Sequence, residues 1–467
     1  MHRFNASRIS PETHVSKNMR RVANALARAF LHDTGDAVEL QRRGAIALGK
    51  KWPWLKRLVR DLLEQFGPEL QARDYDRIVS WILARPAFVA AYENSYPKPE
   101  VRCYFRFHPV MGTTVSGLQT GELPILHTSG DLARWLGLSP TELDWFADPG
   151  AWRSRNAEAK LRHYNYVWKS KSQGGVRLIE IPKERLRWIQ QQILRNILNR
   201  VPVHPSAHGC VKGRSTLTHA SEHAGSPVVL KLDLSDFFTS ISAARVHALF
   251  HSLGYTHEVS RYLTGLTTHS TPPSVLQTMP IDAISKSAAH LRTQREQTEK
   301  FIRRHLPQGA PTSPALANLC AWRLDLRLAG AASESGAHYT RYVDDLVISC
   351  QTQSITHAHR IALMASGIIL EEGFTPNSRK TRVMPQSQAQ RTTGLILNVK
   401  PNIPRKDFDQ LKAILTNCAR HGPETQNRDE HPDFRTHLLG RVAYVLGINP
   451  ERGKKLQNLF DRIIWSS

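Results

Sequence analysis

The sequence predicts an α+β fold in which a mixed core is flanked by two helical regions. Three observations indicate this. Residues 164–182 alternate between apolar and polar side chains on both sides of a Gly-Gly pair, as two paired strands do. Residues 228–238 and 338–350 combine short apolar runs with turn-forming residues. Both ends of the chain carry apolar residues at helical spacing instead, so helices and strands are grouped along the sequence.

The first hundred residues are predicted to be mostly helical. Residues 17–33, 54–66 and 74–93 have apolar side chains at the period of a helix. The proline-containing segment 96–102 then breaks this pattern, because proline lacks a backbone donor and restricts the residue before it.

Two short helices are expected next, one starting near Ser129 and Asp131 and one at Ser139-Pro140. The second start has an N-cap hydroxyl, a proline at the first helical position and Glu142 in the first turn, which together satisfy or match the free amides. The pair has the form of a DNA-reading helix-turn-helix, but helical hairpins of this length more often serve packing alone.

The chain changes character near residue 161. Residues 164–182 are predicted to form two strands and residues 184–201 a long helix. A buried strand running into a turn is expected over 228–238, and a hairpin with Val-Asp-Asp at its tip over 338–350. After Pro401 the pattern is helical again, interrupted by a polar gap at 420–432.

The composition limits the classes of protein and partner. Of the 467 residues, 63 are Lys or Arg and 40 are Asp or Glu, which gives a formal charge of +23, and 40% are hydrophobic, as in an ordinary globular chain. Nucleic acid is the commonest partner for such a surplus. A membrane surface fits less well, because the basic residues are spread along the chain and no run of about 20 apolar residues exists.

The cysteines and the N-terminus point to the cytoplasm. The five cysteines are odd in number and form no Cys-x-x-Cys pair, which argues against a disulfide framework and against a structural zinc site. The N-terminal 30 residues lack the compact apolar stretch of a secretory signal. We therefore expect a cytoplasmic protein without a membrane association.

Three carboxylates stand inside apolar strands. Asp233 follows the apolar run at 228–232, and Asp344 and Asp345 lie between Val343 and Leu346. A buried carboxylate costs several kcal/mol unless a cation or hydrogen bonds compensate it, and adjacent carboxylates repel each other. Divalent metal ions resolve both problems, and two such ions form the phosphoryl-transfer site of polymerases and nucleases. An Asp-Asp turn at a hairpin tip is the alternative interpretation.

Five motifs in order resemble those of reverse transcriptases. Residues 341–349 (RYVDDLVIS) resemble the YxDD hairpin of that family, and residues 230–238 (LKLDLSDFF) its first catalytic strand. Residues 306–319 (LPQGAPTSPALANL) are similar to its substrate-binding loop and helix. Two further segments match in the family's order, namely 171–182 (KSQGGVRLIEIP) and 209–216 (GCVKGRST). The resemblance covers residues 125–465.

Within the family, the chain most resembles the retron reverse transcriptases of bacteria. THASEH (218–223) stands where they carry an Asn-Ala-x-x-His element, with His219 in place of the Asn. RTTGLILN (391–398) stands at their Val-Thr-Gly, with Thr392 in place of the Val. The alternatives are other defence-associated enzymes, group II intron enzymes, and the diversity-generating and CRISPR-linked enzymes. No intron-type His/Cys endonuclease cluster follows the last helix.

The resemblance implies a right-hand polymerase with fingers, an antiparallel palm sheet and a helical thumb. The expected ranges are a mostly helical N-terminal extension of unknown role, fingers, palm and thumb at 1–125, 126–225, 226–400 and 401–467. The palm contains a long polar insert at 267–304 with a basic helix at its end.

The resemblance also implies roles for single residues. Asp233, Asp344 and Asp345 would hold two Mg²⁺ ions, with Mn²⁺ as the alternative metal. Phe238 would reject a ribose 2′-OH, although a core Phe beside Phe237 is the competing interpretation. The residues expected to contact the dNTP are, besides Phe238, Lys171 or Lys169, Arg177, Gln308, Gly309 and Lys380. Lys380 would aid the departure of pyrophosphate, although a solvated surface lysine is the competing interpretation.

Contacts with the nucleic-acid backbone are expected from basic residues that are each equally compatible with a solvated charge. These are Lys212, Arg214, His223 and Arg441, together with Arg185 and Arg187.

The implied activity is RNA-directed DNA synthesis on a dedicated structured non-coding RNA that is both template and primer. The product would be single-stranded DNA linked to that RNA and used in anti-phage defence, with a toxin or effector protein encoded nearby as a further partner. A catalytically vestigial RNA-binding scaffold and a two-metal nuclease are the alternatives from other classes. The intact acidic triad argues against the scaffold, and the LPQG loop with the finger motif argues against the nuclease.

Overall fold

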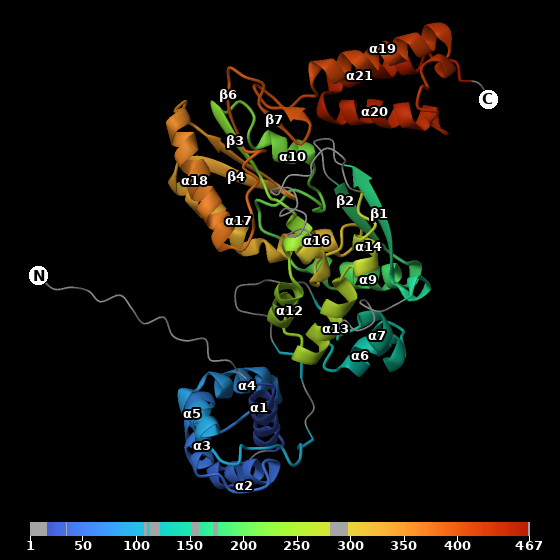
Figure 1. Cartoon of the computed structure of the whole chain (residues 1–467). Coiled ribbons are helices and arrows are strands. Elements are labelled where there is room, and N and C mark those ends of the chain that lie inside the picture. Colours follow the sequence, from blue (N-terminus) through green and yellow to red (C-terminus); the bar gives the residue numbers. More distant parts are fainter. Residues whose placement is uncertain are drawn as a thin grey trace, which may run out of the picture. The chain divides into compact units, whose positions relative to one another are not determined.

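The computed structural model describes residues 16–33, 35–106, 110–112, 122–150, 158–170, 176–280 and 298–465. These residues fall into two compact units. One comprises the described residues within 1–118, 124–149 and 250–264, and the other those within 119–123, 150–249 and 265–467. Figure 1 gives the course of the chain and the element labels. The domain boundaries expected from the sequence, at 125, 225 and 400, stay predictions.

The first unit begins with five helices around one apolar core (Figure 1). The helices are α1 (Lys17–Phe30), α2 (Ala37–Ala47), α3 (Pro53–Phe66), α4 (Tyr75–Ala84) and α5 (Pro86–Asn94). Val22, Leu62 and Ile82 are fully buried members of that core. The helical prediction for this region is confirmed, except that Pro86 divides the stretch 74–93 into two helices, because it has no N–H for the helical ladder.

The same unit contains the two short capped helices, α6 (Ser129–Trp135) and α7 (Pro140–Ala147). Both start with a reciprocal capping box, and α6 begins at Ser129 as predicted, with Thr128 as its N-cap. The pair is tied to α13 (His257–Thr267): Ser129 donates to Glu258 at 2.7 Å, and Tyr262 donates to Asp144 at 2.6 Å. These contacts favour the packing interpretation of the helical pair.

The second unit opens with the predicted hairpin of β1 (Tyr164–Ser170) and β2 (Val176–Pro182), which pair antiparallel. Helix α9 (Glu184–Asn196) follows and confirms the predicted long helix, which ends in a short 3₁₀ turn at Leu198–Arg200. Its buried Gln190 donates to the Tyr164 hydroxyl and to the Leu266 carbonyl, both at 2.9 Å. The hairpin is thereby fixed to the residues that precede the insert.

A four-stranded antiparallel sheet, in the order β4-β5-β3-β6, carries the acidic residues. Its strands are β3 (Val228–Asp233), β4 (Ala337–Tyr342), β5 (Asp345–Cys350) and β6 (Arg382–Pro385). The buried strand and the Val-Asp-Asp hairpin predicted from the sequence are both confirmed. Helices α17 (Trp322–Glu334) and α18 (Ile355–Glu371) lie side by side against this sheet (Figure 1).

Short elements connect these parts. They are α10 (Thr216–Ser221), α11 (Phe237–Ser240), α12 (Ala243–Ser252), α14 (Pro273–Leu276), α16 (Ser313–Cys320), β7 (Arg391–Thr392), β8 (Leu395–Ile396) and the 3₁₀ turns at Ala72–Asp74, Ala159–Leu161 and Pro423–Thr425. Of the polar insert, residues 281–297 lie outside the described residues, and residues 298–302 are helical as predicted.

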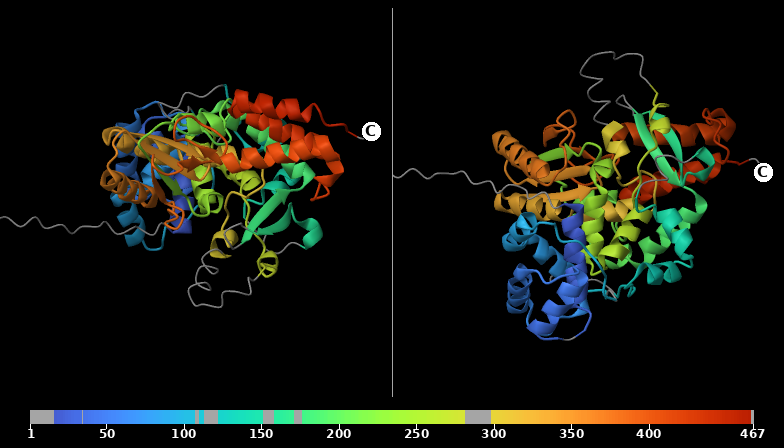
Figure 2. Two further views of the ribbon diagram at one scale, coloured as in Figure 1. Left: turned by 90° about the horizontal axis from the view of Figure 1, so that it is seen from above. Right: turned by 60° about the horizontal axis from the view of Figure 1, so that its bottom comes forward.

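The C-terminal helices α19 (Arg405–His421), α20 (Phe434–Ile448) and α21 (Pro450–Phe460) form a bundle, shown in red in Figure 2. Leu415, Val442 and Leu456 are buried between them. The prediction of helices on both sides of a polar gap at 420–432 is confirmed. Across the described ranges, no helix combines the length and the apolar character needed to cross a membrane.

Candidate active site

The three acidic residues meet at one end of the four-stranded sheet. Asp233 is the last residue of β3 and Asp345 the first of β5, and the strand register places them directly opposite each other. Asp344 lies in the turn between β4 and β5, where its carbonyl accepts a 2.9 Å hydrogen bond from the Leu234 amide. Residues more than 100 positions apart in sequence are thus brought together by strand pairing alone.

The turn that presents Asp344 is held in an unusual conformation. Val343 has a φ of 59°, which is costly for a β-branched residue. Gly209 packs against it so closely that a Cβ there would lie 2.5 Å from the Val343 nitrogen. Position 209 therefore accepts only glycine if the turn is to keep its place.

A buried ion pair between Arg341 and Asp325 also stabilises this turn. The Arg341 guanidinium is fully buried and lies 2.6 Å from the Asp325 carboxylate. It also donates to the Val343 carbonyl and to the Asn318 side chain, both at 3.0 Å, and Asn318 in turn donates to the Gly209 carbonyl at 2.9 Å. Burial lowers the pKa of Arg341, but the charge of Asp325 more than offsets this, so that the pKa is raised and the ion pair persists.

Two lysines neutralise part of the acidic cluster. Lys380 donates to Asp233 at 2.9 Å, and Lys231 donates to Asp345 at 2.9 Å. Asn377 adds a side-chain hydrogen bond of 3.2 Å to Asp233 and a backbone hydrogen bond to its carbonyl. The hydrogen bond to Asp233 raises the pKa of Lys380, which stays charged.

Among the described residues, Asp344 forms no ion pair like those of Asp233 and Asp345, although the charge of Lys380 acts on it as well. Burial raises its pKa, and the charge of Asp345 raises it further. In this state the carboxylate carries an unfavourable like-charge interaction, which a divalent cation would relieve.

The donor set fits divalent metal ions, although it is not preassembled. Within the described part of the chain, no group of three or more His, Cys, Asp or Glu side chains is arranged as a metal centre. Asp233, Asp344 and Asp345 nevertheless supply oxygen ligands at one edge of the sheet, and hard oxygen donors are what Mg²⁺ and Mn²⁺ prefer. A metal would have to displace Lys380 and Lys231 from the carboxylates that they now hold.

Phe237 and Phe238 have separate environments. Phe237 is 3% exposed and packs on Phe374 with ring centroids 5.6 Å apart. Phe238 is half-buried and meets Phe237 at a steep angle. Phe237 therefore occupies the core position, while part of the Phe238 ring stays accessible.

The loop of Gln308 and Gly309 lies against the β1–β2 hairpin. The Glu180 amide of β2 donates to the Gln308 carbonyl at 2.7 Å. Gly309 has a φ of 127°, and a Cβ there would lie 2.8 Å from the Glu180 carbonyl oxygen. Glycine is required at 309 both for its backbone conformation and for this close approach.

Two of the basic residues predicted to hold a triphosphate are paired in the same hairpin. Lys169 and Arg177 are register partners on β1 and β2, and both are exposed. Two positive charges therefore lie opposite each other on neighbouring strands. Lys171 lies outside the described residues.

The four predicted RNA-contact residues differ in what they offer. Lys212 is exposed, and Arg441 is half-buried on α20. Arg214 donates to the Ala207 carbonyl at 2.9 Å and to the Pro205 carbonyl, so its guanidinium is engaged with the backbone of its own loop. Of the flanking residues, Arg185 stacks on Trp188, and Arg187 donates to the Pro182 carbonyl.

His223 differs from its predicted role. It is fully buried and contacts two hydroxyls, Ser349 at 2.9 Å and Thr340 at 2.6 Å. His219 joins the same network through Thr340 at 2.7 Å. Burial lowers the pKa of both histidines, so they are neutral. The RNA contact predicted for His223 is thus replaced by an internal one behind the catalytic hairpin, because no side-chain surface is left for a phosphate.

Sequence reasoning missed Lys231, Asn377 and Arg341. A lysine two residues before Asp233 lies on the same side of β3, and this period-2 spacing is a signal that could have identified Lys231. Arg341 precedes the Tyr-Val-Asp-Asp run and faces the opposite side of β4 from Tyr342. Its partner Asp325 lies on a separate helix, which no local pattern connects to it.

The whole catalytic edge lies inside the part of the chain that matches a known family. Residues 169–397 match the family described as reverse transcriptase (RNA-dependent DNA polymerase). The retron Mx65 reverse transcriptase of Myxococcus xanthus is 38% identical over 341 residues, which cover 72% of this chain and 71% of that protein.

The chain belongs to the retron reverse transcriptases. The retron Mx162 enzyme of Myxococcus xanthus is 33% identical over 70% of this chain and 65% of that protein. The retron Ec86 enzyme of Escherichia coli is 33% identical over 64% of this chain and 80% of that protein.

This retron reverse transcriptase is an RNA-directed DNA polymerase with the right-hand polymerase fold of its family. Enzymes with this domain depend on divalent metal ions, which agrees with the oxygen donors of Asp233, Asp344 and Asp345. The match with the family begins at residue 169, near the end of β1, and contains β2 and the four-stranded sheet. The predicted polymerase activity is confirmed.

Proposed function

We propose that this enzyme reverse-transcribes one dedicated structured non-coding RNA into single-stranded DNA that remains linked to the RNA, and that the product serves anti-phage defence. The observation that carries the proposal is the 38% identity to a retron enzyme over 72% of the chain. The formal charge of +23 suits a folded RNA as a permanent partner. A toxin or effector protein encoded nearby is the further partner in this proposal.

Asp233, Asp344 and Asp345 are the proposed ligands of two Mg²⁺ ions. When bound, such ions activate the attacking hydroxyl and neutralise the charge of the triphosphate. The protein contributes a rigid platform: strand register fixes Asp233 opposite Asp345, and the Val343 turn fixes Asp344. Lys231 and Lys380 would pair with the carboxylates of Asp345 and Asp233 until metal and nucleotide arrive.

The nucleotide is proposed to lie between the hairpin and the sheet edge. Arg177 and Lys169 would bind its triphosphate, with Lys171 as the other candidate. Phe238 would exclude the 2′-OH of a ribonucleotide. Gln308 and Gly309 would lie under the incoming base pair, where the absence of a side chain on Gly309 permits close approach.

Lys380 has a second proposed role. Lys380 pairs with Asp233 in this structure. Once metal ions bind that carboxylate, the Lys380 ammonium group would be free to pair with the leaving pyrophosphate. A charged lysine beside the reacting phosphates favours departure of pyrophosphate without needing to give up a proton.

The proposed fingers, palm and thumb are residues 126–225, 226–400 and 401–467. The thumb bundle α19–α21 would cradle the duplex, with Arg441 of α20 near a phosphate. Leu439 and Tyr444 of the same helix are exposed, at 42% and 49%, and Tyr444, three positions from Arg441, would place an aromatic ring beside that cation at the RNA.

The experiment expresses the gene together with its flanking DNA and isolates the nucleic acids that copurify with the protein. The proposal predicts one abundant short RNA and a DNA of fixed length that shifts in size on ribonuclease treatment. The Asp344→Asn protein is the matched control, which should retain the RNA and lack the DNA. Copurification of mixed cellular RNA without a discrete DNA would contradict the proposal.

A further inference from the structure

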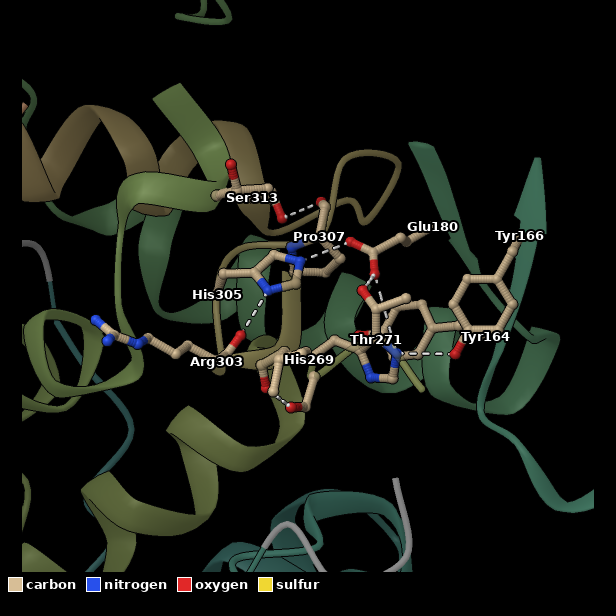
Figure 3. A network of polar contacts seen from close by, with 12 residues as sticks. Tyr164, Tyr166, Glu180, His269, Thr271, Arg303, His305, Pro307 and Ser313 are labelled. Carbon is tan, nitrogen blue, oxygen red and sulfur yellow. Dashed lines mark hydrogen bonds and ion pairs between the residues drawn. The ribbon is translucent and has the colours of Figure 1, made fainter. Parts of the chain in front are cut away.

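A buried polar network joins the fingers hairpin to both ends of the insert. Glu180 of β2 is fully buried, and its carboxylate lies 2.9 Å from Nε2 of His305. The other carboxylate oxygen accepts a 2.7 Å hydrogen bond from Thr271. Figure 3 shows this carboxylate between His305 on one side and Thr271 and His269 on the other. Tyr166 closes the network through a 2.9 Å contact with His269.

The network contains one ion pair. Burial raises the pKa of Glu180, but the charge and hydrogen bond of His305 outweigh it, so the pKa is lowered. Burial lowers the pKa of His305, and the Glu180 charge reverses that effect, so the pKa is raised. Burial lowers the pKa of His269 to about 3, so His269 is the neutral histidine of the two. Charge is therefore concentrated on the Glu180–His305 contact.

The Glu180–His305 pair fixes the start of residues 306–312, which contain Gln308 and Gly309 and are called the nucleotide loop below. His305 lies three residues before Gln308, and its backbone forms a two-way pairing with His269 at 2.9 Å. Glu180 uses its backbone on the same loop: its amide donates to Gln308, and its carbonyl is the group that a side chain at 309 would strike. Ser313 holds the Pro307 carbonyl at 2.7 Å from the other end.

Removing one partner of such a pair leaves an uncompensated buried charge, whereas an apolar replacement of both is often tolerated. A buried ion pair is thus weak evidence for a role in stability alone. Here His305 directly precedes the nucleotide loop. The backbone of Glu180 contacts Gln308 in that loop, and the backbone of His305, just before the loop, pairs with that of His269.

We propose that Glu180 and His305 are positioning residues that set the backbone of Gln308 and Gly309 for the incoming nucleotide. The inference rests on the proposed function, because it assumes that Gln308 and Gly309 lie under the incoming base pair. The same pair also contacts Thr271 and His269, near the start of the insert. Glu180 and His305 therefore hold both the start of the insert and the start of the nucleotide loop.

The first test compares Glu180→Gln with the wild type in single-nucleotide extension of a primed RNA template. The variant keeps the size and a hydrogen bond but loses the charge. The KM for dNTP should rise about tenfold while kcat and the affinity for primer-template stay within about twofold, because the loop and not the metal site is displaced. An unchanged KM would overturn the proposal.

Glu372→Gln is the matched control. Glu372 is a buried carboxylate, 5% exposed, just after the end of α18, and within the described residues its side chain pairs with Arg327 at 2.9 Å and with Arg323 rather than with residues 306–312. The Glu372→Gln substitution should lower thermal stability without changing the KM for dNTP. An equal rise in KM in both variants would assign Glu180 a purely structural role and would overturn the proposal.

A second measurement does not depend on catalysis. Hydrogen exchange of the backbone amides of 306–312 should be faster in Glu180→Gln and in His305→Gln than in the wild type, and unchanged in Glu372→Gln. Unaltered exchange in the first two variants would overturn the positioning role. If the wild type itself incorporates no dNTP, the proposed function fails, while the exchange result still decides whether the pair sets the loop.

Discussion

Gly209 shows how closely the backbone is packed beneath the catalytic carboxylates. A Cβ at this position would meet the nitrogen of Val343 at 2.5 Å and its Cγ2 at 2.6 Å. The first of these atoms belongs to the backbone, so the turn itself must move to accept a larger residue. Any such movement of Val343 also displaces Asp344, since these two residues are consecutive in the turn.

Gly209→Ala should therefore reduce dNTP incorporation by about 100-fold, because small misplacements of a reacting group are that costly. RNA binding should persist. Gly330→Ala is the control: position 330 lies in α17 with open space around it, so an added methyl should leave activity unchanged. Steady-state extension assays measure both variants, and wild-type activity of Gly209→Ala would show that the turn is not required in this form.

Phe238 offers a second test of a single side chain. Phe238→Ala should admit ribonucleotides, because the half-buried ring near Asp233 is the group proposed to collide with a 2′-OH. Alkali-labile product reveals ribonucleotide incorporation. Phe238→Tyr keeps the ring and should still exclude them. If Phe238→Ala excludes NTPs as well as the parent does, the selectivity lies elsewhere.

Much of the site could be predicted at this scale, but not its counter-ions. Asp233, Asp344 and Asp345 interrupt apolar runs, and this conflict between burial and charge is visible in the sequence. The partners Lys380 and Asn377 lie more than 140 positions from Asp233, and only the fold brings them together. His223 was assigned to RNA because a motif position does not reveal burial.

At the scale of elements, the thumb bundle separates a core face from an outer face on one helix. Leu438, Val442 and Val445 of α20 are buried, whereas Leu439 and Tyr444 are exposed. Tyr444, three positions from Arg441, places an exposed aromatic ring beside this cation, which suits a helix that follows the shape of folded RNA.

Replacing residues 434–465 with the thumb of a related retron enzyme should switch which non-coding RNA is reverse-transcribed. The replacement should keep the buried positions of α20 and α21, so that the bundle still folds. Extension of a generic primed template serves as the control and should remain. Retention of the original RNA preference would contradict a role of the thumb in RNA choice.

Elements were predictable where local rules act alone. The β1–β2 hairpin, the hairpin of β4 and β5 and the capped helix α7 follow from alternation, turn residues and caps, and the structure confirms them. The order β4-β5-β3-β6 could not be derived, because it depends on long-range pairing between strands. The buried Glu180–His305 pair was missed for the same reason: its residues are 125 positions apart.

At the scale of the whole molecule, the positive surplus contrasts with the acidic catalytic edge. A chain with a formal charge of +23 gathers three carboxylates at one end of a sheet, which is the distribution expected if nucleic acid is bound broadly and metal locally. Cations that neutralise phosphates release counter-ions on binding, so affinity becomes salt-dependent.

Binding of a primer-template should accordingly weaken about 10³-fold or more between 50 and 200 mM salt, as for proteins with many phosphate contacts. Fluorescence anisotropy at several salt concentrations measures the slope. The Asp344→Asn protein should show the same slope, because this change touches no phosphate-binding cation. A salt-independent affinity would contradict binding through phosphate contacts.

The most direct test of the central claim, that the Asp233, Asp344 and Asp345 edge makes DNA on RNA, is dNTP incorporation by Asp344→Asn on a primed RNA template with Mg²⁺. The account predicts a loss of at least about 100-fold with unchanged affinity for RNA. Thermal stability should be unchanged or slightly higher, because burial and the charge of Asp345 already raise the pKa of Asp344. Extension at the wild-type rate would contradict the account.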